Sequence, residues 1–222
     1  MNENINNGIL IVLSSPSGAG KTSIAKELIK TDNRIKFSIS VTTRPPRSNE
    51  KDGREYFFKT EEQFNQYIEK KQLLEHANVF GYRYGTLIDQ TRYQLNKGYD
   101  LLFDVDWQGG KQLKSSYLKN QLISVFILPP SLNELETRLS NRGQDSKEII
   151  HNRMKQSFSE ISHWNEYDYV LVNKSLKDTV KKLNDIVSEE RLNRINRKIT
   201  QKFVDKLEKE FNIIKSKNDY KV

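Results

Sequence analysis

The stretch Leu13–Ser23, "LSSPSGAGKTS", constrains the fold of this chain more than any other part of its sequence. It follows the apolar run "GILIV" and precedes a segment whose apolar residues recur at helical spacing. A buried strand over 9–14 and a helix over 21–30 are therefore predicted on either side of a glycine-rich turn. Residues 15–22 match the phosphate-binding pattern G-x-x-x-x-G-K-[ST], except that Ser15 replaces the first glycine.

This loop has the chemistry of a nucleoside triphosphate site. Gly18 and Gly20 let the backbone curl so that its N–H groups face phosphate oxygens, and the following helix adds its positive N-terminal dipole. Lys21 supplies a positive charge to the β- and γ-phosphates, and the Thr22 hydroxyl can bind Mg²⁺. A glycine-rich turn that merely precedes a lysine is the structural alternative. The residues predicted to bind the nucleoside triphosphate are Ser15, Pro16, Ser17, Gly18, Ala19, Gly20, Lys21 and Thr22.

Strands alternate with helices along the rest of the chain, which is typical of an α/β fold with a parallel sheet between helices. We expect further buried strands over 37–41 and in the runs "DLLFDVD", "LISVFIL" and "YDYVLVN". Residues 40–86 interrupt this alternation with a mixed β-rich patch, as an inserted lobe would. Two helices joined around Gly143 predict a helical lid over about 138–155.

Composition narrows the class of protein. The chain has 222 residues, no cysteine and a formal charge of +8. It has no apolar run near 18 residues, which excludes a helical membrane span, and its first residues lack a secretory signal pattern. We therefore expect a cytoplasmic protein that is not bound to a membrane.

The positive charge is concentrated at the end of the chain. From Arg191 onward there are ten Lys or Arg and four Asp or Glu, a net charge of +6, which leaves +2 for the preceding residues. The tail is predicted to be helical, because its apolar residues recur every three or four positions. A solvated helix face is the simpler explanation of its charge, so no nucleic-acid partner is expected. A homodimer stays open.

A second group of residues has the chemistry to bind a phosphorylated acceptor. Arg44 and Arg47 stand three positions apart in the proline-stiffened loop after a strand, and two close guanidinium groups suit a doubly charged phosphate. Tyr56 and Tyr84 add hydroxyl donors. The carboxylate of Glu75 can accept two parallel N–H bonds, as from guanine, whereas adenine lacks that pair of donors.

Two carboxylates end the strand "LLFDVD". Asp104 is the better candidate to hold metal-bound water behind the phosphate loop, and Asp106 is expected to face the acceptor. The sequence alone does not separate their roles, and such residues can also cap the next turn. Arg138, Arg142 and Arg153 lie on the two predicted lid helices, where they can be lowered onto the triphosphate or simply face solvent.

The motifs "SSPSGAGKTS", "SISVTTRPPR", "DGREYFF", "YGT", "DVDWQG" and "RLSNRG", in this order, resemble those of the guanylate kinase family. The resemblance covers about residues 8–191, so 192–222 is predicted to be a separate basic helical tail. It implies a P-loop NTPase-type fold and the reaction ATP + GMP = ADP + GDP, with Mg²⁺ bound to ATP, in purine metabolism. An inactive protein-interaction module of the same family and a kinase for another nucleoside monophosphate are the alternatives.

The resemblance also implies site residues. Asn173 is expected near the adenine, Arg142 and Arg153 are the stronger lid candidates, and Thr86 keeps a hydroxyl where relatives often have serine. The expected GMP-binding residues are Ser40, Arg44, Arg47, Tyr56, Glu75, Tyr84, Thr86 and Asp106. The expected catalytic residues are Lys21, Arg44, Arg142, Arg153 and Asp104. The expected metal-binding residues are Thr22 and Asp104.

Overall fold

The computed structural model describes residues 8–79, 81–140 and 147–218. Two compact units divide between Lys182 and Leu183, and each is described by itself. Unit 1 contains both β-sheets and all helices before the last one. Unit 2 consists of the greater part of the final helix, α7 (Leu176–Asn218).

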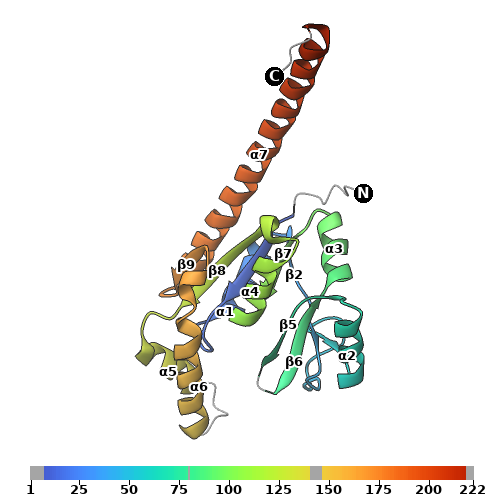
Figure 1. Ribbon diagram of the computed structural model, residues 1–222. Helices are drawn as coiled ribbons and strands as arrows, with labels where there is room; N and C mark the ends of the chain where they lie inside the picture. Colours follow the sequence, from blue (N-terminus) through green and yellow to red (C-terminus); the bar gives the residue numbers. More distant parts are fainter. Residues whose placement is uncertain (1–7, 80, 141–146, 219–222) are drawn as a thin grey trace. The chain divides into compact units, whose positions relative to one another are not determined.

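The core of unit 1 is a five-stranded parallel sheet with the order β2-β7-β1-β8-β9 (Figure 1). Its central strand is buried along its whole length, as expected for a strand covered on both faces. The predicted parallel α/β fold and four of its predicted strands are confirmed. The confirmed strands are β1 (Leu10–Ser14), β7 (Asp100–Asp104), β8 (Leu122–Leu128) and β9 (Tyr169–Val172), and the fifth strand of the sheet is β2 (Ile35–Phe37).

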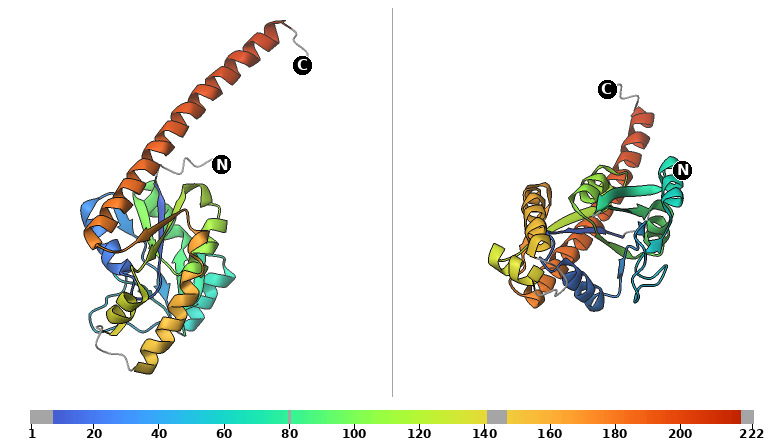
Figure 2. Two further views of the ribbon diagram at one scale, coloured as in Figure 1. Left: turned by 90° about the vertical axis from the view of Figure 1, so that its left-hand side faces the viewer. Right: turned by 90° about the horizontal axis from the view of Figure 1, so that it is seen from below.

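Helices cover both faces of this sheet. Figure 2 shows α1 (Lys21–Thr31) and α4 (Trp107–Ser115) on opposite faces, and α1 buries Ile24, Ala25 and Leu28. α4 packs against β1 and β8 and also against β5 of the second sheet, so it links the two sheets. The sequence pattern of α4 does not predict a helix. Two further helical elements are α3 (Ile88–Asn96) and the 3₁₀ turn η1 (Lys119–Gln121).

A mixed four-stranded sheet with the order β4-β3-β6-β5 lies within the predicted lobe. The prediction of a single strand over 37–41 is wrong. The chain leaves the parallel sheet after Phe37 and joins the second sheet only at Val41. A capping box on Thr60 begins α2, whose Phe64 is fully buried. The elements are β3 (Val41–Thr42), β4 (Phe57–Phe58), α2 (Glu61–Glu69), β5 (Leu73–Val79) and β6 (Tyr82–Leu87).

The two predicted lid helices are α5 (Leu132–Ser140) and α6 (Lys147–Ile161), which pack against each other. The Ser131 hydroxyl accepts the N–H of Glu134 at 3.1 Å and so caps the start of α5. Arg142 and Gly143 lie outside the described residues. The 3₁₀ turn η2 (Trp164–Glu166) follows α6 and leads into β9.

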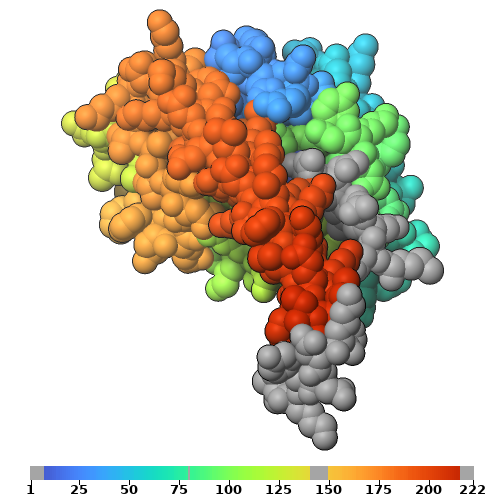
Figure 3. Space-filling model, turned by 90° about the horizontal axis from the view of Figure 1, so that it is seen from above, coloured from blue at the N-terminus to red at the C-terminus, as the bar shows by residue number. Residues whose placement is uncertain are grey.

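Unit 2 is a single helix from Leu183 to the end of α7. The sequence predicted a separate helical tail over 192–222, and the described part of that segment, up to Asn218, is helical as the continuation of α7. Along its described length the helix exposes many apolar side chains. Figure 3 draws the described atoms of this helix in orange and red. Among the described residues, no helix combines the length and the apolar character that a membrane crossing requires.

Candidate active site

The loop after β1 has the backbone of a phosphate-binding loop. Gly18 and Gly20 adopt left-handed φ angles of 91° and 97°, which side chains disfavour, and α1 begins at Lys21. A Cβ atom on Gly20 would stand 2.5 Å from the side-chain nitrogen of Asn173. The loop therefore needs glycine at both positions. The start of α1, directly after the loop, provides the unpaired N–H groups of a helix N-terminus.

Side chains from distant segments hold the loop from behind. The amide of Asn173 donates to the Ala19 carbonyl at 2.8 Å and accepts from the Thr179 hydroxyl at 3.2 Å. Arg138 donates to the same carbonyl at 3.4 Å. On the other side, the Glu160 carboxylate of α6 accepts the Ser17 N–H at 3.1 Å. The loop is thus held by Asn173, which follows β9, and by Glu160 of α6.

The two aspartates at the carboxyl end of β7, Asp104 in the strand and Asp106 after it, have different surroundings. Asp104 forms an ion pair with Lys21, with 2.6 Å between Nζ and Oδ1, and Lys21 also donates to the Val105 carbonyl at 3.2 Å. Asp106 caps α4, because its carboxylate accepts the Gly109 N–H at 2.9 Å and the Gln108 side chain at 3.0 Å. The Asp104 side chain therefore contacts the lysine of the phosphate loop, whereas the Asp106 side chain caps the start of α4.

Glu75 is a buried carboxylate on β5, with only 4% of its surface exposed. The hydroxyl of Thr86, its neighbour on β6, donates to it at 2.7 Å. Burial raises the pKa of Glu75 to about 7, the Thr86 hydrogen bond opposes that rise, and the charge of Asp106 adds to it. A Cβ atom on Gly109 would lie 2.7 Å from its carboxylate, so α4 approaches Glu75 as closely as a glycine permits.

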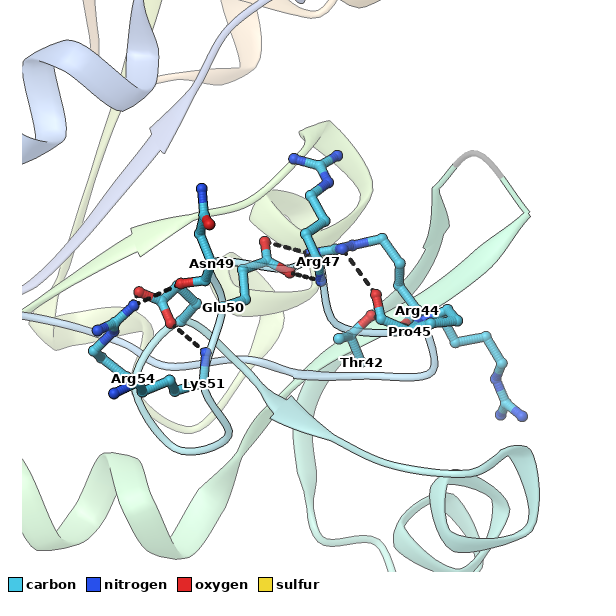
Figure 4. A network of polar contacts seen from close by, with 10 residues as sticks. Thr42, Arg44, Pro45, Arg47, Asn49, Glu50, Lys51 and Arg54 are labelled. Atoms are coloured by element: carbon cyan, nitrogen blue, oxygen red, sulfur yellow. Dashed lines mark hydrogen bonds and ion pairs between the residues drawn. The ribbon is translucent and has the colours of Figure 1, made fainter.

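The arginine loop after β3 is ordered around one carboxylate (Figure 4). One guanidinium nitrogen of Arg44 donates to both carboxylate oxygens of Glu50, at 2.8 and 2.9 Å. The Glu50 carboxylate also accepts the backbone N–H of Arg47 at 2.8 Å. The hydrogen bond from Arg44 lowers the pKa of Glu50. The Arg44 guanidinium lies 5.3 Å from the centre of the Tyr56 ring. The Glu50 carboxylate thus has the kind of cationic and N–H donor partners that a phosphate would have.

A cavity of about 370 Å³ joins the phosphate loop to the second sheet. Several predicted residues do not line it. Thr86 supports the lining residue Glu75, and Asn173 supports the buried Ala19 of the loop. Arg44, Arg47 and Arg153 also lie outside the lining. The predicted residues that line it are Ser15, Pro16, Ser17, Gly18, Gly20, Lys21, Thr22, Ser40, Tyr56, Glu75, Tyr84, Asp104 and Asp106.

Two residues of this site had no signal in the sequence, and the role of a third was not evident from its motif. The roles of Glu160 and Glu50 could not be predicted, because the groups that these two carboxylates bind become their neighbours only in the folded chain. Glu160 lines the cavity, where burial raises its pKa and the charge of Lys21 opposes that rise. Gly109 belongs to the motif "DVDWQG", but only the structure explains why a glycine is needed there.

The described residues contain no group of three or more His, Cys, Asp or Glu side chains arranged to hold a metal ion. A protein-only metal cage is therefore absent from that part of the chain. The hydroxyl of Thr22 and the carboxylate of Asp104 both line the cavity beside Lys21. Such a donor set fits a magnesium ion that reaches the protein together with phosphate oxygens.

A phosphate-binding loop at the carboxyl end of a central parallel strand, with a second polar wall across the same cavity, defines a P-loop phosphotransferase fold. The chain belongs to the guanylate kinase family, since the family model described as "Guanylate kinase" matches residues 7–190.

Known proteins agree with this assignment. The guanylate kinase of Ruegeria pomeroyi is 51% identical over 204 residues, which cover 92% of this chain and 96% of that protein. That of Rickettsia prowazekii is 47% identical over 186 residues, covering 84% and 93%. Among solved structures, the guanylate kinase of Anaplasma phagocytophilum is 34% identical with a TM-score of 0.68, covering 83% of this chain and 86% of that one.

Proposed function

We propose that this chain transfers the γ-phosphoryl group of ATP to GMP and releases ADP and GDP. The observation that carries the proposal is the shared cavity, which has the phosphate loop on one wall and the buried Glu75 on the other. Membership of the guanylate kinase family supports the same reaction. Phosphoryl transfer needs alignment of two phosphates and compensation of their charge, and a single cavity with both walls supplies the alignment.

On the donor side, the loop 15–22 binds the triphosphate of ATP through its N–H groups and the start of α1. Lys21 holds the β- and γ-phosphates, and its ion pair with Asp104 keeps the ammonium at the cavity wall. Thr22 and Asp104 would hold Mg²⁺, Asp104 through water. When bound, the metal neutralises charge on the phosphates. Asn173 acts in ATP binding through the Ala19 carbonyl that its amide fixes.

On the acceptor side, the second sheet and its arginine loop bind GMP. Arg44 and Arg47 take its phosphate, for which the Glu50 carboxylate on the same two residues is a chemical stand-in. The hydroxyls of Tyr56 and Tyr84 and the side chain of Ser40 complete this wall of the cavity. The rings of Tyr56 and Tyr84 pack edge to face with 5.8 Å between their centres, which fixes the two hydroxyls relative to each other.

Glu75 reads the guanine base. A carboxylate with nearly no exposed surface discriminates strongly, because a partner without matching N–H groups leaves it buried and unpaired. Thr86 holds the carboxylate in place, and Asp106 borders the same wall. Adenine offers an acceptor where guanine offers a donor, so the Glu75 carboxylate favours GMP over AMP.

The lid closes over the transferred group. Arg153 is carried by α6, the helix whose Glu160 accepts the Ser17 N–H of the phosphate loop. We propose that movement of α5 and α6 brings Arg153 and Arg142 toward the triphosphate and excludes water, which would otherwise hydrolyse ATP. Arg138, which contacts the Ala19 carbonyl, steadies the loop.

A coupled assay of ADP formation tests the proposed reaction. The protein is supplied with ATP and Mg²⁺ and with GMP, AMP, CMP or UMP in turn, and a sample without acceptor measures hydrolysis. We expect kcat/KM for GMP to exceed that for each other nucleotide by about 100-fold or more. An equal or higher value for another nucleotide contradicts the acceptor assignment. The absence of turnover with all four identifies an inactive module of the family.

A further inference from the structure

Unit 2 carries a continuous apolar stripe on the surface of α7. Seven side chains that are 46% to 61% exposed make up the stripe: Leu192, Ile195, Ile199, Phe203, Leu207, Phe211 and Ile214. Single exposed apolar residues are common, but a long contiguous stripe of large ones is typical of an interaction surface. The side chains of this helix are drawn from orange to red in Figure 3. The question is which partner covers them.

The spacing of the stripe reads the same from both ends. Its intervals are 3, 4, 4, 4, 4 and 3 residues, and the midpoint is Phe203. A second α7 running antiparallel, with a twofold axis through Phe203, would therefore match every apolar residue with another. The opposed pairs are Leu192 with Ile214, Ile195 with Phe211, Ile199 with Leu207 and Phe203 with itself. A twofold interface needs such a self-complementary surface.

The period of the stripe also suits a long straight contact. Leu192, Phe203 and Ile214 are spaced eleven residues apart, and the other four lie between them. An eleven-residue repeat corresponds to about 3.67 residues per turn, close to the 3.6 of a straight α-helix. The stripe therefore stays on one face for about 33 Å, the length of 22 residue steps at about 1.5 Å each.

The charges distinguish the two possible directions of pairing. Residues 191–202 contain five basic and no acidic side chains, whereas residues 204–215 contain three of each. Parallel pairing would set the five positive charges of one copy against the five of the other. Antiparallel pairing places the basic segment of each copy along the mixed segment of its partner, which removes that repulsion.

The area is sufficient for a specific pair. Seven large side chains with about half of their surface exposed offer roughly 700 Å² per helix, or about 1,400 Å² for two, which is within the usual range of stable interfaces. We propose that α7 forms an antiparallel pair with the α7 of a second copy of this chain, centred on Phe203. A membrane surface suits the stripe less well, because Asp205, Glu208 and Glu210 lie in its second half.

Sedimentation equilibrium of the full chain tests the pairing. Between about 1 and 100 μM, where interfaces of this size dissociate, the wild type should approach twice its mass of 26.1 kDa. Phe203→Glu places two like charges on the axis and should keep the protein monomeric. Asn212→Glu adds the same charge away from the stripe and should leave the dimer intact. GMP kinase activity serves as the folding control for both variants, since the proposed site residues all precede Lys182.

Disulfide trapping tests the direction, and the chain offers a clean background because it has no cysteine. Phe203→Cys should cross-link to itself. Leu192→Cys alone should not, but a mixture of Leu192→Cys and Ile214→Cys chains should give the mixed disulfide. Self-linking of Leu192→Cys would indicate parallel pairing and overturn the proposal. So would a wild type that stays monomeric throughout, whether or not it binds vesicles of anionic phospholipid.

Discussion

Replacing Glu75 with glutamine should stabilise the protein in alkaline solution. Burial raises the pKa of Glu75 from 4.5 to about 7, so the folded state holds a proton that the unfolded chain releases at lower pH. The favourable contribution of this group is complete below pH 4.5 and is lost as the pH rises through 7. At pH 8.5 the ionised, buried carboxylate costs the folded state about 3 kcal/mol, at about 1.4 kcal/mol for each pKa unit.

Glutamine has the same shape and carries no charge, so Glu75→Gln should recover that free energy of unfolding. Its advantage over the wild type should be about 3 kcal/mol at pH 8.5 and less than about 1 kcal/mol at pH 5. In a unit of this size the alkaline gain corresponds to a rise of roughly 6 to 12 °C in Tm. Thr86 keeps a partner in the variant, because its hydroxyl can donate to the amide oxygen.

Urea denaturation at pH 5, 6, 7 and 8.5 measures the effect. Glu69→Gln is the matched control, because Glu69 is an exposed glutamate on α2 and its loss should produce no comparable pH-dependent gain. The reasoning is refuted if the difference between Glu75→Gln and wild type is the same at pH 5 and pH 8.5. That result would mean that the buried carboxylate is not the group whose ionisation destabilises the fold.

Three further perturbations test the other parts of the site. Lys21→Met should lower kcat about 100-fold or more while the melting curve stays close to that of the wild type, because a preorganised charge on the phosphates is lost; near-normal turnover would sink the phosphate-loop assignment. Glu160→Leu leaves the Ser17 N–H without its acceptor and should lower kcat/KM for ATP about 10-fold, whereas Glu160→Gln should keep most of the activity. Equal losses in both variants would argue against the role of Glu160 in positioning the phosphate loop. Deleting residues from Thr200 onward should leave kcat/KM for GMP within about 2-fold, since a change of only tenths of a kcal/mol is expected there; a soluble but inactive product would place unit 2 in the catalytic body.

The phosphate loop and the parallel sheet were predictable because local sequence determines them. Apolar strand runs, glycines with required φ angles and a lysine at the start of a helix all lie within about twenty consecutive residues. The strand over 37–41 failed for a different reason. Its residues have strand character, but the chain changes sheets between Phe37 and Val41, and no local pattern records that change.

Helix α4 escaped prediction because its sequence argues against a helix. Two glycines in its first turns each cost about 1 kcal/mol relative to alanine, and its apolar pattern is short. The helix forms because Asp106 caps it and because its glycines allow close packing against Glu75 and Tyr167. Tertiary contacts thus overcome a poor local propensity.

The partners of the site's charged groups were equally hidden. Arg44 with Glu50 and Ser17 with Glu160 become pairs only when the loop after β3 and the lid helix fold, the latter across 143 residues of sequence. The candidate residues themselves were predictable from their chemistry and from the family resemblance. Their geometry was not.

The most direct test of the account compares kcat/KM for GMP and for AMP at saturating ATP in the wild type and in Glu75→Gln. Hydrogen bonds to a buried charged acceptor contribute roughly 1.5–3 kcal/mol, so the variant should lose about 10- to 100-fold in kcat/KM for GMP. Its kcat/KM for AMP should fall less or rise, which narrows the GMP/AMP ratio. An unchanged ratio would show that Glu75 does not read the base, and the claim that this cavity selects guanine would be contradicted.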